Sequence, residues 1–265
     1  MKNIRKKKDC SNKTFTVVSV GKTETGRKAK PLHINKSQSN DTAALEAHYK
    51  AMIDKGLDVF KVELVVTDML AAYTEVVKKM FPAALHQWCV FHVIQMLNGV
   101  FKDALKEHRH KVFKVGARKD AHKISFLMLK GQEKLTREER EQVTDFCERF
   151  PDMAAGYVLK EDIRMLYAYA KTEVQAVAFR DILVEQYEDK IPESLEKVLN
   201  FLSKEFEPTI SYLKLGAPDA KTNNDAERIM RKIKQMQKVH YCFRKDEHFM
   251  RHIKVLLGLD IIIAA

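Results

Sequence analysis

The spacing of hydrophobic residues changes along the chain, and the first 60 residues already show two different periods. Residues 14–20 are rich in β-branched and aromatic side chains, residues 21–26 have the composition of a turn, and residues 31–34 are extended again. This arrangement predicts a β-hairpin. The Ser39-Asn40-Asp41 segment can then cap a helix, because apolar residues recur at helical spacing from Ala44 to Ile53.

A second strand region follows this helix. The short apolar run over residues 61–67 ends at Asp68 and predicts a strand that is buried on at least one face. The pattern then predicts a helix over residues 70–81, a short strand over 84–89 and a helix from about residue 91. Strands that alternate with helices in this order are typical of an α/β fold with a mixed sheet.

The pattern between residues 100 and 220 is entirely helical. Thr136 and Glu139 have the spacing of a capping box, which predicts the start of one of these helices. A last helix is expected from about Asp225, with Ile229, Ile233 and Met236 on one face.

Charge is distributed unevenly over the chain, whose net charge is +11. Residues 1–36 carry a net charge of +9 and residues 221–254 carry +6, whereas residues 37–220 are slightly acidic at −3. Two separate basic segments suit a polyanionic partner, because Lys and Arg neutralise phosphates in nucleic-acid complexes. A basic surface without a ligand is the alternative.

The cysteines and the hydrophobic segments limit the cellular setting. The four cysteines are far apart and include no C-x-x-C pair, so neither a disulfide framework nor a Cys-rich zinc site is expected. No signal peptide is visible, and the apolar residues 255–265 are too few to span a bilayer. We therefore expect a cytoplasmic protein without a membrane segment.

Asp68 is the first candidate for chemistry, because it directly follows a predicted buried strand. Ligands of open α/β folds bind at the carboxyl ends of strands, and an acidic residue there can take part in a site. Asp is also a frequent helix N-cap, so capping of the next helix is an equally simple explanation of the residue.

The segment from His86 to His92 concentrates three possible metal ligands, His86, Cys89 and His92. A structural zinc site needs four ligands, and the nearest other pair, His240 and Cys242, is distant and separated by only one residue. The simpler interpretation is a buried cysteine and a hydrogen-bonded histidine where a strand meets a helix.

Glu227 lies in the first turns of the last predicted helix. A glutamate near a helix N-terminus also complements the helix dipole, which is an ordinary structural role. The cations of this helix lie on a different side from its apolar residues and are Arg228, Arg231, Lys232 and Lys238.

The order of these motifs resembles that of DDE transposases of insertion-sequence type, and it is similar to that of the Mutator-like transposases. The resemblance extends from about Ile4 to Leu257, with Cys242 in place of the glycine usual before Phe243. The motifs that carry it are strand-Asp68, Phe81-Pro-x-Ala, His86-Gln-x-Cys-x-Phe-His92, Leu135-Thr-x-Glu-Glu-Arg140, Phe150-Pro, Tyr157-x-Leu-Lys-Glu161 and Thr222-Asn-Asn-x-x-Glu227-Arg.

The resemblance implies an α/β fold in which a ribonuclease H-like mixed-sheet core is interrupted by a large all-helical insertion. The core would comprise residues 1–105 and 216–265, and the insertion residues 106–215. Asp68 and Glu227 match the second and third of three carboxylates that hold two Mg²⁺ or Mn²⁺ ions, and Cys89 and His92 match a C-x-x-H signature.

The partners implied by the resemblance are double-stranded DNA, as element ends and target, and further copies of the full-length chain. The basic residues Arg228, Arg231, Lys232 and Lys238 would hold backbone phosphates without reading bases. The reaction would be metal-dependent phosphodiester hydrolysis and strand transfer.

The first carboxylate of the family falls just before Met1 in this comparison. Asp9 is the only acidic residue nearby, and it follows a run of cations without a strand to position it. We therefore expect a truncated copy that binds Mg²⁺ poorly. The alternatives are a non-catalytic DNA-binding remnant of such an enzyme and a structural α/β protein without a nucleic-acid role.

Overall fold

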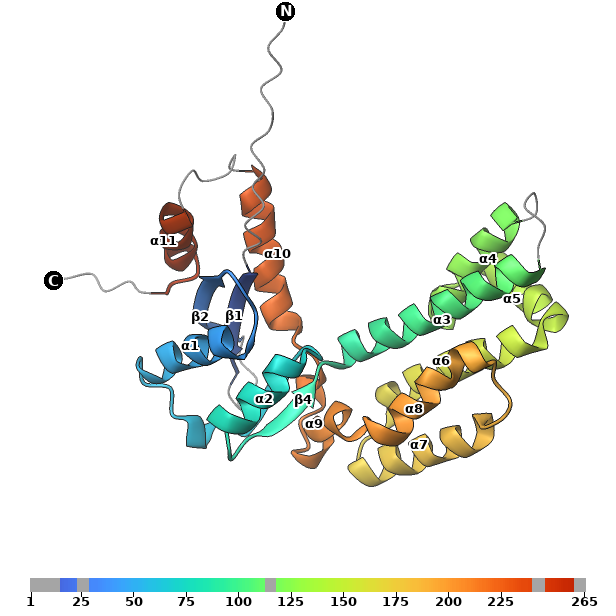
Figure 1. Ribbon diagram of the computed structural model, residues 1–265, viewed down its shortest axis with the longest axis horizontal. Coiled ribbons are helices and arrows are strands. Elements are labelled where there is room, and N and C mark those ends of the chain that lie inside the picture. Colours follow the sequence, from blue (N-terminus) through green and yellow to red (C-terminus); the bar gives the residue numbers. More distant parts are fainter. Residues whose placement is uncertain (1–14, 23–28, 113–117, 240–245, 260–265) are drawn as a thin grey trace, which may run out of the picture. The chain divides into compact units, whose positions relative to one another are not determined.

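The computed structural model describes residues 15–22, 29–112, 118–239 and 246–259. Helices dominate, and within this part of the chain no helix is long and apolar enough to cross a membrane. The elements, shown in Figure 1, are β1 (Phe15–Gly21), β2 (Lys30–Ser37), α1 (Thr42–Ile53), η1 (Val59–Lys61), β3 (Leu64–Thr67), α2 (Ala71–Met80), β4 (Leu85–Trp88), α3 (Val90–Val112), α4 (Arg118–Leu129), η3 (Gln132–Lys134), α5 (Arg137–Arg149), α6 (Pro151–Tyr169), α7 (Glu173–Tyr187), η4 (Glu193–Leu195), α8 (Glu196–Lys204), η5 (Glu207–Thr209), α9 (Ser211–Lys214), η6 (Pro218–Lys221), α10 (Asn224–Val239) and α11 (Asp246–Leu256).

Within the described ranges, the strands form two small sheets. β1 and β2 pair in antiparallel fashion, with an irregularity between Ser19 and Val20, which confirms the predicted hairpin. β3 pairs with β4 in a second two-stranded sheet, whereas the sequence predicted one mixed sheet. β3 is also shorter than predicted, because the Asp58 side chain accepts a hydrogen bond from Phe60 N and begins the 3-10 turn η1.

The chain divides into two compact units. Unit 1 comprises residues 1–65, 70–84 and 223–265, and unit 2 comprises residues 66–69 and 85–222. Each unit therefore combines segments that are distant in sequence, and all the helices from α3 to α9 belong to unit 2.

Two hydrophobic clusters lie among the described residues of unit 1. In the first, α1 packs against α2 through residues that include Leu45, Val76 and Phe81. Asp41 caps α1 by accepting a hydrogen bond from Ala44 N, as its sequence predicted. In the second, Ile34 of β2 meets the buried residues Ile233, Phe249 and Ile253 of α10 and α11.

Unit 2 consists mainly of helices that pack around α3. Its core includes Phe101, Leu105, Met128, Phe146 and Leu195, which come from α3, α4, α5 and η4. Gly156 of α6 is buried, and a Cβ atom at this position would overlap the Leu195 side chain. The close approach of α6 to its neighbours therefore requires glycine here.

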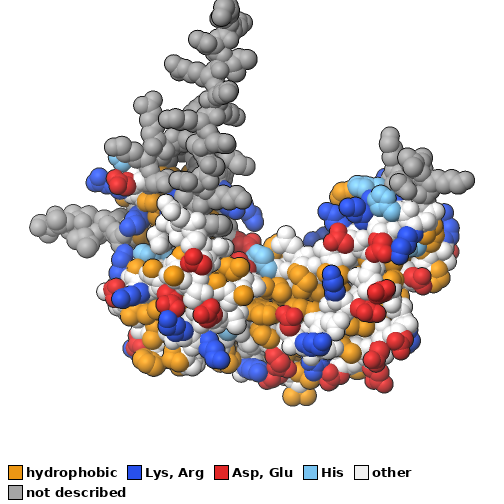
Figure 2. Space-filling model, in the orientation of Figure 1, with side chains coloured by type: hydrophobic (Ala, Val, Ile, Leu, Met, Phe, Trp, Pro, Cys, Tyr) orange, Lys and Arg blue, Asp and Glu red, His pale blue; other side chains and the backbone are white. Residues whose placement is uncertain are grey.

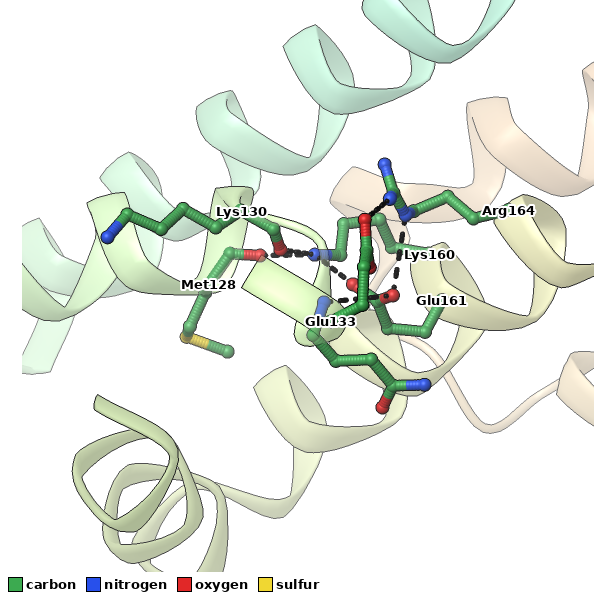
Figure 3. A network of polar contacts seen from close by, with 7 residues as sticks. Met128, Lys130, Glu133, Lys160, Glu161 and Arg164 are labelled. Atoms are coloured by element: carbon green, nitrogen blue, oxygen red, sulfur yellow. Dashed lines mark hydrogen bonds and ion pairs between the residues drawn. The ribbon is translucent and has the colours of Figure 1, made fainter. Parts of the chain in front are cut away.

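A buried polar network joins α6 to the end of α4 (Figure 3). The Lys160 ammonium donates to the backbone oxygens of Met128 (2.6 Å) and Lys130 (2.7 Å) and forms an ion pair of 2.5 Å with Glu161. Arg164 Nε lies 3.4 Å from Glu161, and its guanidinium also pairs with Glu133 at 2.6 Å. Lys160 thus satisfies carbonyl groups that the end of a helix leaves without partners.

The predicted capping box at the start of α5 is confirmed. Glu139 N donates to Thr136 Oγ1 (3.2 Å), and Thr136 N donates to Glu139 Oε2 (3.1 Å). We expect Thr136→Ala to lower the free energy of unfolding by about 1 kcal/mol, because an N-cap acceptor is lost. Thermal unfolding measures this change, and Thr144→Ala, in the exposed middle of α5, is the control that should not lower stability, because alanine favours the helix.

Candidate functional site

The carboxyl end of β3 is held by a chain of hydrogen bonds around Thr67. The Thr67 hydroxyl donates to the backbone oxygen of Asp68 (2.7 Å), and His86 Nε2 of β4 lies 2.8 Å from the same hydroxyl. Because the hydroxyl hydrogen is directed at Asp68, His86 Nε2 is the donor to Thr67. Burial lowers the pKa of His86 to about 4, so the ring is neutral at pH 7 and serves to fix the strand end.

Asp68 is not the N-cap residue of the next helix. The N-cap of α2 is Leu70, whose side chain makes no capping hydrogen bond. Asp68 lies two residues before this cap, and its half-buried side chain follows the end of a strand, where α/β folds bind ligands.

Cys89 and His92 lie beside this strand end. Cys89 N donates to the backbone oxygen of Thr67 (2.7 Å), and the Cys89 side chain is fully buried. α3 begins at the next residue, so the half-buried His92 lies in its first turn. The buried cysteine and the hydrogen bond of His86 agree with the simpler of the two interpretations of this segment.

Metal ligands do not gather in the described part of the structure. No group of three or more His, Cys, Asp or Glu side chains there has the geometry to hold an ion. His240 and Cys242, the other pair considered for zinc, lie outside the described residues, as does Asp9.

Gln87 is a site residue that sequence reasoning missed. Its side chain is fully buried, its Nε2 donates to Thr209 O (2.8 Å), and its Oε1 accepts from Tyr212 N (3.0 Å). The Ser211 hydroxyl donates to the backbone oxygen of His86 (2.8 Å). Hydrogen bonds thus connect β4, the strand that carries His86, to residues 209–212. In the sequence, the only sign of this role is a polar residue inside a predicted strand.

Glu227 lies in the first turn of α10, half-buried, with its backbone N–H bonded to Asn223 O (3.1 Å). The predicted apolar face of this helix is confirmed, since Ile229, Ile233 and Met236 join the second cluster of unit 1. The cations Arg228, Arg231 and Lys232 are exposed; Lys238 lies within the helix, but its side chain is outside the described residues.

The predicted site residues fall into two groups. Asp68, His86, Cys89 and His92 belong to unit 2, where Thr67 bonds to both His86 and Cys89 directly before Asp68. Glu227 belongs to unit 1 and lies in the first turn of α10.

Comparison with known families agrees with the motif order. The model of the ISL3 family of DDE transposases, described as a transposase, matches residues 5–253. No curated protein matches the chain.

Proposed function

Because the chain belongs to the ISL3 family of DDE transposases, we propose that Asp68 and Glu227 are two of the carboxylates with which it cleaves and transfers DNA. The observation that carries this proposal is the position of Asp68, which directly follows a strand end fixed by Thr67 and His86. The substrates would be the two ends of an insertion element and a DNA target.

The fold proposed for this function is a ribonuclease H-like core with a helical insertion. The order of β1, β2, α1, β3, α2 and β4, followed by helices only, supports this proposal. In this proposal, residues 1–105 and 216–265 form the core, and residues 106–215 form the insertion.

The donor set fits Mg²⁺ or Mn²⁺, since both proposed ligands are carboxylates and hard cations prefer oxygen. Asp68 and Glu227 would hold the ions, and Cys89 and His92 would support the strand end next to Asp68. When bound, two such ions activate a water or a DNA 3′-hydroxyl and stabilise the leaving oxygen of an in-line displacement.

DNA binding would use the exposed cations of α10. Arg228, Arg231 and Lys232 lie away from the apolar face that packs in unit 1, and Lys238 follows on the same helix. They would contact backbone phosphates, which position a duplex without reading its sequence. We propose that the enzyme acts as a homo-oligomer, since two element ends must be processed together.

Metal binding provides the direct test. Even an ion that binds weakly to the folded state stabilises it at a high concentration, so we expect excess Mn²⁺ to raise the melting temperature of the chain. Asp68→Asn and Glu227→Gln should each reduce this shift, whereas the exposed controls Asp219→Asn and Glu247→Gln should retain it. Equal shifts in all four variants would show that neither carboxylate is a ligand.

DNA nicking separates the two candidate forms of this function. Mg²⁺-dependent nicking of plasmid DNA that Glu227→Gln abolishes indicates an active transposase. Salt-dependent duplex binding without nicking indicates a non-catalytic DNA-binding remnant, and the absence of duplex binding at low salt would exclude both.

A further inference from the structure

The outer face of α3 carries a stripe without carboxylates. Gln95, Gly99, Lys102, Lys106 and Arg109 are spaced by alternating intervals of four and three residues, which places them on one side of the helix. The first four are exposed and Arg109 is half-buried. Because α3 begins directly after Cys89, the stripe leads away from the strand end that carries Asp68.

The cations of this stripe are available to a ligand. Within the described residues, no carboxylate lies within ion-pair distance of Lys102, Lys106 or Arg109. Lys111 differs, because it pairs with Glu107 at 2.6 Å on the neighbouring side of α3. Figure 2 shows Lys, Arg and His side chains near the end of the hairpin formed by α3 and α4.

Gly99 has no packing role that would explain it. It is exposed in the middle of α3, and a Cβ atom there would meet nothing within 4 Å. Glycine inside a helix costs about 0.5–1 kcal/mol relative to alanine. Its absent side chain does allow a ligand to approach the helix backbone closely, and it lies one turn before Lys102.

We propose that this stripe, residues 95–109 of α3, is a binding surface for the phosphate backbone of double-stranded DNA. Lys102 to Arg109 extend over about 10 Å of helix, the length over which one DNA strand rises by about three phosphates. The surface would guide the duplex away from the site around Asp68. This inference rests on the proposed function and adds a second DNA contact to that of α10.

The test compares two triple variants of the full chain that remove the same charge. Lys102→Gln/Lys106→Gln/Arg109→Gln removes the stripe, and Lys50→Gln/Lys78→Gln/Lys134→Gln removes three scattered exposed cations. Binding of a short fluorescein-labelled duplex is measured by anisotropy over a series of KCl concentrations. We expect the stripe variant to lower the slope of log K against log salt by about 2–3, because each phosphate contact contributes about 0.9.

Gly99→Ala tests whether the DNA backbone approaches α3 closely, and both the melting temperature and duplex binding are measured. Alanine should raise the melting temperature by about 1–3 °C, because helix propensity improves and no clash arises. The same substitution should weaken duplex binding about threefold or more if the backbone of DNA approaches this turn. A variant that is more stable and binds DNA as tightly as wild type would contradict the proposed approach.

The outcomes separate this inference from the proposed function. If the wild-type chain binds no duplex DNA, the proposed function fails. If it binds DNA and both triple variants have equal slopes, the proposed function stands and the α3 surface is overturned.

Discussion

Lys160→Met is expected to lower the free energy of unfolding of unit 2 by about 3–5 kcal/mol, because breaking one side of a buried ion pair leaves the other charge buried. The side chains of Lys160 and Glu161 are only 5% and 7% exposed. The loss also leaves the carbonyl groups of Met128 and Lys130 without their shared donor. Burial lowers the pKa of Lys160, and the ion pair with Glu161 opposes this shift, so the charge depends on its partner.

The effect should decrease toward the surface of the same network. Arg164→Met removes the pair with Glu133, whose side chain is 55% exposed, and the longer 3.4 Å contact to Glu161. We expect a smaller loss of about 1 kcal/mol, because Glu161 keeps its pair with Lys160. Lys134→Met, at an exposed position of η3, is the control for the loss of a lysine. Urea denaturation followed by the fluorescence of Trp88, which lies in unit 2, measures all three. Equal losses for Lys160→Met and Lys134→Met would contradict the role of the buried pair.

The buried network around Lys160 also explains a sequence motif to which the sequence alone assigned no function. In the sequence, Tyr157-x-Leu-Lys-Glu161 indicates only a family resemblance. In the structure, Lys160 and Glu161 form the ion pair, and the centroid of the Tyr157 ring lies 4.5 Å from Lys160 Nζ. Adjacent charges in a helix pattern predict a solvated face. Only the distant carbonyl groups, 30 and 32 residues earlier in the chain, make burial favourable.

Local signals predicted the elements well where one short segment decides the structure. The caps at Asp41 and Thr136 and the apolar face of α10 follow from spacings of three or four residues, and all three are confirmed. α11 was missed, because its burial depends on Phe249 and Ile253 meeting Ile34 of β2. Such a contact has no signature in a short sequence window.

The candidate site also contains residues that a local pattern predicts and residues whose roles appear only in the fold. Asp68 could be selected because it ends an apolar run, and Cys89 and His92 because their spacing matches a motif. The roles of Thr67, Gln87 and Ser211 depend on partners 19 to 125 residues away. Residues that position a site through long-range hydrogen bonds therefore become visible only in the fold.

Unit 1 is expected to lose stability as the pH falls from about 6.5 to 4, because it buries a neutral histidine between the hairpin and α1. His48 is fully buried, its Nε2 lies 2.8 Å from Ser19 Oγ, and its ring centroid is 4.9 Å from that of His33. Burial, with a smaller contribution from the charge of His33, lowers the pKa of His48 to about 4.

The sign follows from proton binding. Between pH 4 and 6.5 the unfolded chain protonates His48 and the folded chain does not, so stability is complete above about pH 6.5 and falls as the pH drops toward 4. The shift of the pKa corresponds to a loss of at most about 3 kcal/mol. Hydrogen exchange of the α1 amides, corrected for intrinsic rates, should show this loss in wild type and a weaker pH dependence in His48→Gln. His86→Gln is the matched control, since His86 has a similarly lowered pKa but belongs to unit 2; an α1 profile altered by His86→Gln and not by His48→Gln would contradict the assignment.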